Sequence, residues 1–335
     1  MTVANQFEIL DLRHFSARQL RPLLEDEARI WQTRLRWNYE SSIDLLLQYL
    51  DSRILPGFVS LDRGRICGFT FCVYEGRKAV VGDVYAVAGS AEQTIQITER
   101  LLQHLLDLLI HSPGVERIES QMLLYDSGAI DNVFLDAGFT LFPRLFMEFD
   151  PAPDAPVASR NQIGTRIPDS LELAPWTAAC YQPAAELIHD AYADHIDASI
   201  NDQYRTLHGS LRFLHNIVRF PGCGVFEANS SWVLRDRSTG TLAGMLLCSR
   251  VSPDVAHVTQ ICVAPAYRKQ RLGQMLMEHS MAHLSDGGFV SITLTVTEAN
   301  AQAVRLYERL GFTVRHRFNA MVRDTGSSTR DSYST

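Results

Sequence analysis

A basic turn near residue 270 carries the side chains of this chain that are best suited to binding an anion. It follows an apolar strand pattern at 258–263, which Pro265 ends, and it leads into a helical pattern that begins at Leu272. Where a strand gives way to the first turn of a helix, free backbone N–H groups and the helix dipole attract negative charge. The turn therefore predicts a pyrophosphate site, in which the N–H groups matter most and the side-chain charges second. Its residues are Arg268, Lys269, Gln270, Arg271, Leu272 and Gly273.

A second pattern, made of a strand, a polar loop and a helix, spans residues 294–310 and ends at Gly311. Glycine directly after a helix is typical of the C′ position, where a positive φ costs little for this residue. Asn300, Ala303 and Tyr307 share one helix face by their spacing. The pattern therefore places an amide and a phenol together beside the end of a strand.

Together, the two patterns resemble the motifs of the GNAT superfamily of acyl-CoA N-acyltransferases. The second block agrees with the family pattern throughout. The first departs from it at Arg271, where the family usually has glycine, and a side chain there would either crowd the pyrophosphate or add a contact to it. The matching residues are Val263, Pro265, Tyr267, Arg268 and Gly273 in the first block, and Asn300, Ala303, Leu306, Tyr307, Gly311 and Phe312 in the second.

The resemblance implies an α+β (mixed α/β) fold with two tandem GNAT-like domains, each a mixed, mostly antiparallel sheet flanked by helices. Internal similarity supports the tandem arrangement, because Val84–Val87 corresponds to Gln260–Val263 at an offset of 176 residues. Helical patterns at 17–50 and 181–220 open the two halves. We expect domains at 1–150 and 171–325, a Pro-rich linker at 151–170 and a disordered tail at 326–335.

The N-terminal copy lacks the chemistry of the second copy. Phe134, which has no hydroxyl, stands where the second copy has Tyr307. Glu92 stands near the position of Arg268, and a carboxylate beside a pyrophosphate is repulsive. We expect this degenerate copy to be non-catalytic and to have a structural role.

The resemblance also implies a reaction. Acetyl-CoA is the expected co-substrate, its thioester lies along Ile261, Cys262 and Val263, and a primary amine attacks it directly in a ternary complex. Tyr307 is the expected acid for the leaving thiolate, since the family motif places this hydroxyl near the coenzyme sulfur. A phenol with an ordinary pKa of about 10 can protonate a thiolate as it forms.

The proton acceptor and the role of Asn300 are less defined. His257 alternates with Thr259 and Ile261 along the strand, which predicts a common face, and its position corresponds to a catalytic glutamate of some family members. We expect His257 to be the base, with a relayed water or an amine that arrives neutral as alternatives. Asn300 is expected to bind the pantetheine arm or to order the loop, and a simple helix N-cap is the alternative, which does not exclude the first role.

The sequence does not identify the amine that accepts the acetyl group. The segment His189–Asp197 falls in the region that lines the acceptor site in the family, and its three carboxylates suit a cationic amine, although a solvated loop is the favoured interpretation. The tandem layout looks like mycothiol synthase, which acetylates a small amine. The second block is also similar to that of ribosomal-protein N-terminal acetyltransferases, whose acceptor is a protein α-amine. A non-catalytic CoA-binding or scaffold protein is the alternative from another class.

Composition restricts the partners further. With 46% hydrophobic and 21% charged residues, both halves can bury a core. Residues 1–150 carry 14 lysines and arginines against 21 acidic residues, and residues 151–335 carry 17 of each, so neither half has the basic excess of a nucleic-acid binder. No apolar run reaches the roughly 18 residues of a membrane span, and no secretory signal is visible.

Cysteine and histidine spacing predicts no metal site. The six cysteines include no Cys-x-x-Cys pair, and His279 and His283, four residues apart, lack a third ligand. We therefore expect a reduced, cytoplasmic protein without structural metal, and a monomer is favoured because tandem copies can pair internally.

Overall fold

The structure is a computed structural model that describes residues 7–150, 167–219, 222 and 224–325. The chain divides into two compact units. The described part of the first unit consists of residues 7–35, 39–143 and 317–325, and the described part of the second consists of residues 36–38, 144–150, 167–219, 222 and 224–316.

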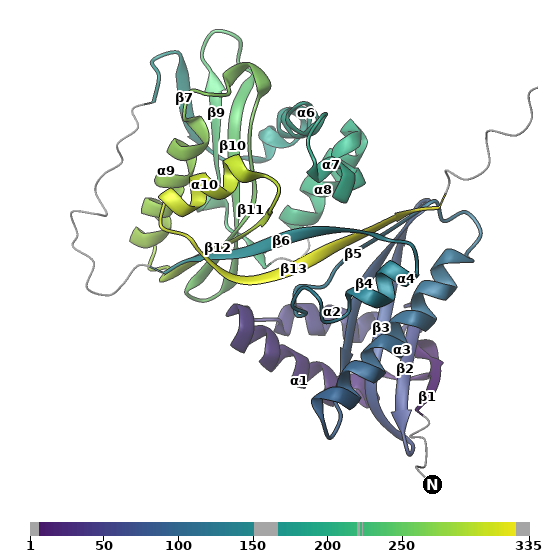
Figure 1. Ribbon diagram of the computed structural model, residues 1–335. Helices are drawn as coiled ribbons and strands as arrows, with labels where there is room; N and C mark the ends of the chain where they lie inside the picture. The colour runs from purple at the N-terminus through teal and green to yellow at the C-terminus, as the bar shows by residue number, and fades with distance from the viewer. Residues whose placement is uncertain (1–6, 151–166, 220–221, 223, 326–335) are drawn as a thin grey trace, which may run out of the picture. The chain divides into compact units, whose positions relative to one another are not determined.

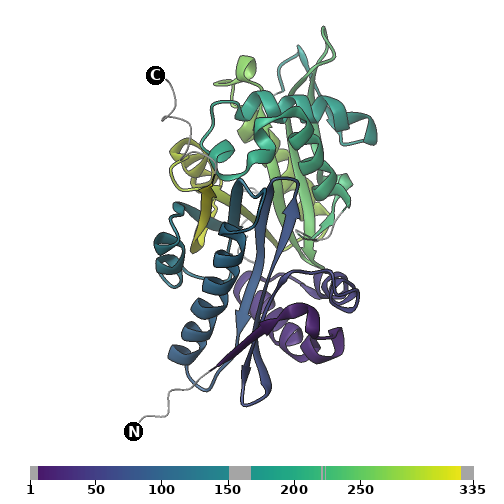
Figure 2. The same ribbon diagram turned by 90° about the vertical axis from the view of Figure 1, so that its right-hand side faces the viewer.

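The first unit is a sheet with helices on both faces. Its strands follow the order β1-β2-β3-β4-β5-β13, where β13 is Thr313–Asp324, with β4 and β5 parallel and the other pairs antiparallel. Helix α3 covers one face, and α1 and α2 cover the other (Figure 2). The elements are β1 (Glu8–Asp11), α1 (Ala17–Leu35), α2 (Glu40–Asp51), β2 (Gly57–Asp62), β3 (Arg65–Glu75), β4 (Lys78–Ala86), α3 (Ala91–Ile110), β5 (Arg117–Gln121) and α4 (Asp131–Asp136).

The second unit repeats this design. Its strands follow the order β13-β6-β12-β11-β10-β9-β7, and within this order the β11–β12 pair is parallel. Helices α9 and α10 pack on one face of the sheet, and α6 and α8 pack on the other (Figure 1). The elements are β6 (Thr140–Phe149), β7 (Leu171–Pro175), α6 (Tyr181–Tyr192), α7 (Asp197–Ile200), α8 (Leu207–Arg219), β8 (Val225–Phe226), β9 (Trp232–Asp236), β10 (Leu242–Ser252), β11 (Val255–Val263), α9 (Leu272–Asp286), β12 (Ser291–Thr297), α10 (Ala301–Arg309) and β13 (Thr313–Asp324). Short 3-10 turns lie at Leu12–His14 in the first unit and at Ala178–Cys180, Asp202–Arg205, Ala228–Ser230 and Pro265–Tyr267 in the second.

Two local features recur in both units, which agrees with the predicted tandem repeat. A β-bulge lies at Gly82, where β4 pairs with β3, and at Thr259, where β11 pairs with β10. Helices α4 and α10 also end alike, because Gly138 and Gly311 have φ values of 77° and 93°. The predicted C′ position of Gly311 is thereby confirmed.

The two units differ from the expected domain limits of 1–150 and 171–325, because each contains part of a strand from the other half of the sequence. Residues 144–149 pair with β12 of the second unit, and residues 320–324 pair with β5 of the first unit. Each of these segments pairs with an edge strand from the other half of the sequence, and local periodicity does not reveal such a pairing. Most of the predicted linker (151–166) and the predicted tail (326–335) lie outside the described residues.

The helical pattern at 17–50 forms two helices, because the chain turns after Leu35. Arg36 takes the left-handed conformation with φ 59°, which ends α1, and α2 begins at Glu40. The short segment 36–38 belongs to the second unit, where the Asn38 N–H donates to the Val251 carbonyl at 2.7 Å.

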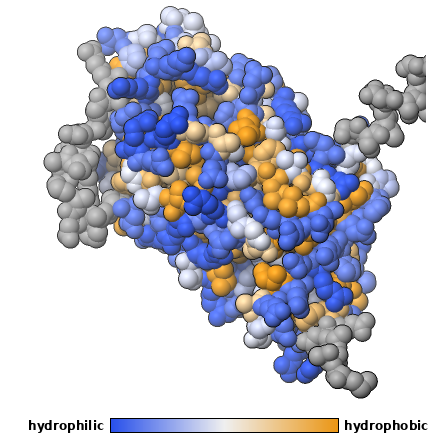
Figure 3. Space-filling model, viewed as in Figure 1, coloured by the Kyte–Doolittle hydropathy of each residue, from blue (hydrophilic) through white to orange (hydrophobic). Residues whose placement is uncertain are grey.

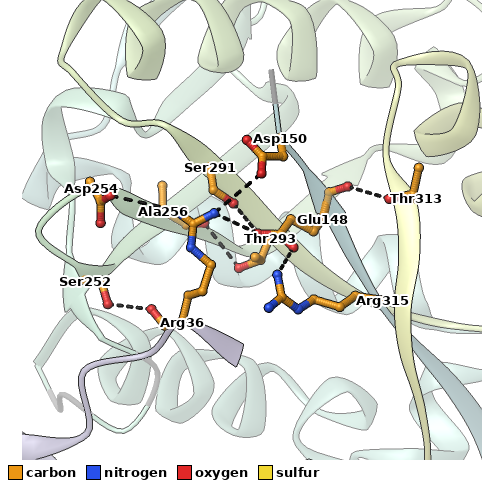
Figure 4. A network of polar contacts seen from close by, with 10 residues as sticks. All are labelled: Arg36, Glu148, Asp150, Ser252, Asp254, Ala256, Ser291, Thr293, Thr313 and Arg315. Carbon is orange, nitrogen blue, oxygen red and sulfur yellow. Dashed lines mark hydrogen bonds and ion pairs between the residues drawn. The ribbon is translucent and has the colours of Figure 1, made fainter. Parts of the chain in front are cut away.

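Glu148 lies at the centre of a polar network in the second unit (Figure 4). It accepts hydrogen bonds from Ser291 at 2.7 Å and from Arg315, and the Arg36 guanidinium lies 3.3 Å away. Burial by itself would raise the pKa of Glu148, but the Ser291 hydroxyl and the two guanidinium groups outweigh burial and lower it. Arg36 also approaches Asp254 at 3.7 Å.

Replacing Glu148 should therefore destabilise the second unit in a pH-dependent way. Because the folded pKa of Glu148 is lowered, its stabilisation is present above the unfolded value near ~4.3 and is lost as pH falls through the folded value. At neutral pH, Glu148→Gln should cost about 2 kcal/mol in urea unfolding, and this difference should shrink below about pH 4. Glu172→Gln, which removes a half-exposed carboxylate from the same unit, is the control. Equal midpoints for both variants at neutral pH would contradict the expectation.

Candidate active site

The second unit contains an opening where β11 and β12 separate. The two strands pair in parallel from Val255 with Ser291 to Val258 with Leu294, and their pairing ends there. A cavity of about 450 Å³ lies beyond this point, lined by both strands, the basic turn, α10 and the end of α6. Splayed parallel strands leave backbone groups exposed along the cavity, where a ligand can reach them.

The basic turn presents a row of backbone N–H groups at this cavity. Lys269 and Arg271 take the left-handed conformation, with φ values of 62° and 59°. The first helical bond of α9 runs from the Met275 N–H to the Arg271 carbonyl at 3.0 Å. Within the described ranges, no group accepts a hydrogen bond from the backbone N–H groups of residues 269–274. Together with the dipole of α9, these donors form an anion site that fits a pyrophosphate.

Two side chains hold the turn in place. Arg268 Nη2 donates to the Ala191 carbonyl in the last turn of α6 at 2.7 Å, which also places a cation at the negative end of that helix. The Tyr267 hydroxyl donates to the Asp236 carboxylate at 2.8 Å. The donors are therefore positioned before a ligand arrives.

Arg271 has the left-handed backbone conformation that suits the glycine of the family pattern. This residue precedes α9 in a left-handed conformation, which glycine adopts freely and which costs other residues about 1 kcal/mol. Its exposed side chain lines the cavity, so it adds positive charge beside the N–H groups. The neighbouring Gly273 leaves open space, because a Cβ there would have its nearest contact at 3.8 Å.

Tyr307 and Asn300 flank the cavity from α10. The Tyr307 side chain is buried, lines the cavity and packs against Phe312. Burial, assisted by the negative charge of Asp197, raises the pKa of Tyr307 well above its ordinary value, so the hydroxyl keeps its proton. Asn300 caps α10, since its Oδ1 accepts from the Ala303 N–H at 3.2 Å, as the alternative interpretation predicts.

His257 lies outside the lining of this cavity. It is 5% exposed, and its Nδ1 lies 2.8 Å from the Thr293 hydroxyl. Its ring packs against Trp37 and Phe146, with centroids 4.9 and 6.1 Å away. Burial, with a contribution from the Arg144 charge, lowers the pKa of His257 to about 3, so the ring is neutral near pH 7.

The bulge at Thr259 explains this position. Gln260 pairs with Leu247 and Val258 with Cys248, so Thr259 is an extra residue in β11. One extra residue reverses which face the side chains occupy. Ile261 therefore packs toward α9, whereas His257 points to the opposite face. The predicted common face of His257 with Ile261 is wrong, and the geometry gives the expected base role of His257 no support.

Aromatic residues form the wall of the cavity next to α6. The rings of Tyr192 and Tyr204 stack with centroids 4.3 Å apart. Gln260 joins them, because its Nε2 donates to the Tyr192 hydroxyl at 3.1 Å and its Oε1 accepts from Tyr204 at 3.3 Å. This wall thus combines aromatic faces with hydroxyl and amide groups.

A histidine and a carboxylate stand beside this wall. His195 Nδ1 accepts from the Asp197 N–H at 3.2 Å and lies 3.6 Å from the Asp197 carboxylate, and Nε2 lies 3.2 Å from Asn300 Nδ2. The Thr297 hydroxyl donates to Asp197. Both His195 and Asp197 line the cavity. Of the three carboxylates in the segment 189–197, Asp197 alone is among the described residues that line it.

Most of the expected binding residues meet at this one cavity, and two of the expected site residues, Gln270 and His257, are not part of its lining. The lining contains Ile261, Cys262, Val263, Arg268, Lys269, Arg271, Leu272, Gly273, Asn300 and Tyr307.

Comparison with known proteins agrees with this geometry. Residues 194–312, which include the cavity, the turn and α10, match the model of the acetyltransferase (GNAT) family. This chain contains a GNAT acetyltransferase domain. The fold also extends across both units, since a tandem GNAT protein from the clavulanic acid biosynthesis pathway covers 96% of this chain and 100% of its own length at a TM-score of 0.59 and 16% identity.

Curated relatives match the GNAT domain over shorter stretches. The [ribosomal protein bS18]-alanine N-acetyltransferase of Salmonella typhimurium is 41% identical over 64 residues, which are 19% of this chain and 43% of that protein. The mycothiol acetyltransferase of Corynebacterium efficiens is 34% identical over 76 residues, 23% of this chain and 26% of that protein. This chain thus spans less than half of the length of these relatives.

The face of the GNAT domain that carries α9 and α10 is largely polar (Figure 3). Figure 3 shows hydrophilic side chains over much of the face that carries α9 and α10, with smaller apolar patches among them. In the described residues, no group of three potential metal ligands is found, and His279 and His283 pack edge-on against Trp232. Cys223 lies outside the described residues, and the other cysteines are free and buried. No described helix is long and apolar enough to cross a membrane.

Sequence reasoning missed Tyr204, Gln260 and Arg144, which all line the cavity. No motif marks the first two. Arg144 lies in the other sequence half, far from every residue of the GNAT blocks, so only the strand exchange brings it to the cavity. The structure thus adds these residues to the cavity lining that the two motifs predicted in part.

Proposed function

We propose that this protein is an acetyl-CoA-dependent N-acetyltransferase whose working site is the cavity of the second unit. The observation that carries the proposal is the row of N–H groups at residues 269–274, which lack acceptors among the described residues and stand beside the splayed strands. Acetyl-CoA supplies the acetyl thioester. The turn binds its pyrophosphate, with the Gln270 backbone N–H among the donors, and Ile261 and Asn300 line the same proposed coenzyme path.

In this proposal the amine attacks the thioester carbonyl in a ternary complex. A C–N bond forms, the C–S bond breaks, and the amine loses a proton to a base. The raised pKa of Tyr307 keeps its hydroxyl protonated, so it can give that proton to the leaving thiolate. Backbone N–H groups of β11, near the bulge at Thr259, polarise the carbonyl.

We propose His195 rather than His257 as the proton acceptor. His195 lines the cavity, and in the tautomer that carries its proton on Nδ1, beside the Asp197 carboxylate at 3.6 Å, Nε2 can take the proton of the amine while the carboxylate stabilises the charged ring. His195→Gln should lower kcat/KM by about 100-fold with acetyl-CoA affinity retained. His208→Gln, which changes an exposed histidine of α8, is the control. If both variants keep full activity, His195 is not the base.

The first unit is proposed to be the non-catalytic copy. Phe134 occupies the position of Tyr307 on the short helix α4 and is fully buried against Phe139. At the start of α3, the Ser90 hydroxyl accepts from the Gln93 N–H at 3.2 Å, so this helix end is capped from within. The separation of β4 and β5 is bridged by Tyr125, which donates to the Val84 carbonyl at 3.0 Å.

Calorimetric titration of acetyl-CoA, followed by an amine screen that measures thiol release and the acetylated product, tests the proposal. We expect about one coenzyme per chain and acetylation of at least one class of primary amine. The acceptor named for one relative is a ribosomal-protein alanine, so peptides with a free α-amine belong in the screen together with small amines. No coenzyme binding would overturn the proposal, and binding without transfer to any amine would favour the scaffold alternative.

A further inference from the structure

Arg144 is a cation of the cavity wall that has no carboxylate partner among the described residues. Its Nη2 makes a long contact of 3.4 Å to the Thr295 hydroxyl. Its Nε is buried and has no hydrogen-bond partner in the part of the chain that the structure describes. The arginines around Glu148, by contrast, are paired with carboxylates. A buried guanidinium donor without a partner is costly, and an anion supplied by a ligand would satisfy it.

Arg144 lies on the sheet face opposite to α9. On β6, Leu145 and Met147 pack into the core beneath α9 and α10, whereas Phe146 stacks on His257 at the other face. Side chains alternate along a strand, so Arg144 shares the face of Phe146. The pyrophosphate turn belongs to the N-terminus of α9. The anion that Arg144 lacks is therefore a different one from the coenzyme pyrophosphate.

A negative group lies on the same face as Arg144. Threonines alternate with core residues along β12, and Thr295 contacts Arg144 while Thr297 donates to Asp197. Asp197 and Arg144 both line the cavity, and no ion pair joins them. The acceptor side of the cavity thus presents one cation and one anion that are available to a single ligand.

We propose that Arg144 binds a carboxylate of the acceptor, so that the substrate is a small amine of the amino-acid type, with a primary amine and a carboxylate on one molecule. The ammonium form of such a substrate is drawn toward Asp197 and its carboxylate toward the guanidinium. The planar guanidinium can hold a carboxylate with two parallel hydrogen bonds, which fixes the orientation of the amine. This inference rests on the proposed acetyltransferase function.

The test compares amines that differ only in the carboxylate. Amino acids are assayed beside their decarboxylated counterparts, for example phenylalanine with phenethylamine and lysine with cadaverine. We expect at least one amino acid to be acetylated with kcat/KM roughly 10- to 150-fold above that of its counterpart. A free amino acid as the preferred acceptor would separate this protein from enzymes that modify protein α-amines.

Substitutions at Arg144 test whether this residue causes the preference for an acceptor with a carboxylate. Arg144→Gln should raise the KM of the amino acid by a similar factor, leave the KM of acetyl-CoA unchanged and leave the counterpart amine unaffected. Arg144→Lys, which keeps the charge but loses the planar fork, should fall between. Arg212→Gln, an exposed arginine of α8, controls for the change in net charge. Circular dichroism melting checks that each variant is folded.

Failure of this inference is distinct from failure of the proposed function. Equal activity on both members of each pair, or a loss in Arg144→Gln that is the same for both, would overturn the carboxylate role while leaving an acetyltransferase. Acetylation confined to peptides with an amidated C-terminus would do the same and favour a protein α-amine. No acetyl transfer to any amine would overturn the proposed function itself, and the inference with it.

Discussion

Tyr307→Phe is expected to lower kcat for acetyl transfer by about 100-fold or more while the affinity for acetyl-CoA stays within about twofold. The hydroxyl is the sole difference, and the buried ring keeps its packing against Phe312. Without it, the thiolate must leave unprotonated or take a proton from water. Stopped-flow or steady-state thiol release, combined with calorimetry, measures both quantities.

Tyr181→Phe is the matched control for this variant. Its hydroxyl is also buried, lies outside the cavity lining and belongs to the same unit. Because burial raises the pKa of Tyr307, wild-type kcat should show no loss as pH rises toward about 10, where an ordinary tyrosine would ionise. Full activity of Tyr307→Phe would remove the tyrosine from the chemistry and leave thiolate protonation to solvent.

Charge reversal at the turn is the second large effect. Arg268→Glu should weaken acetyl-CoA binding by roughly 30- to 1,000-fold, which corresponds to about 2–4 kcal/mol. The carboxylate would repel the pyrophosphate, and the hydrogen bond that ties the turn to the Ala191 carbonyl would be lost. Calorimetric titration measures the affinity directly and should show the single binding event disappear.

Two further variants separate the loss of the positive charge from the repulsion that a carboxylate adds. Arg268→Gln removes the charge without adding repulsion, so its loss of affinity should be smaller. Arg237→Glu reverses an exposed charge outside the cavity lining and should leave binding unchanged. An unaltered affinity in Arg268→Glu would mean that the pyrophosphate does not bind at the turn, and the coenzyme path proposed for the second unit would then be wrong.

Features that depend on residues close in sequence could be predicted. The turn at 268–273 and the glycine that ends α10 follow from interactions between neighbours, since a cap, a strand end or a left-handed residue needs few distant partners. The expected coenzyme residues from Ile261 to Gly273 accordingly line one cavity, with Gln270 as the exception.

Features that depend on strand pairing could not be predicted from the sequence. The bulge at Thr259 arises from the register of β10 against β11, and it moves His257 away from the face on which strict alternation would place it. The exchanged strands depend on pairings between residues more than 140 positions apart, as between Arg144 and Thr297. Period-two patterns identify a strand but do not specify its neighbour.

The sequence by itself thus determined the family resemblance, the anion-binding turn and the α10 face of Tyr307 and Asn300, because short-range backbone geometry and helical spacing fix them. Only the tertiary structure decided which side chains meet across the cavity. Arg144 and Asp197 come from distant segments and reach one face through neighbouring threonines of β12. Contacts of this kind are set by long-range hydrogen-bond register and core packing, which no local pattern encodes.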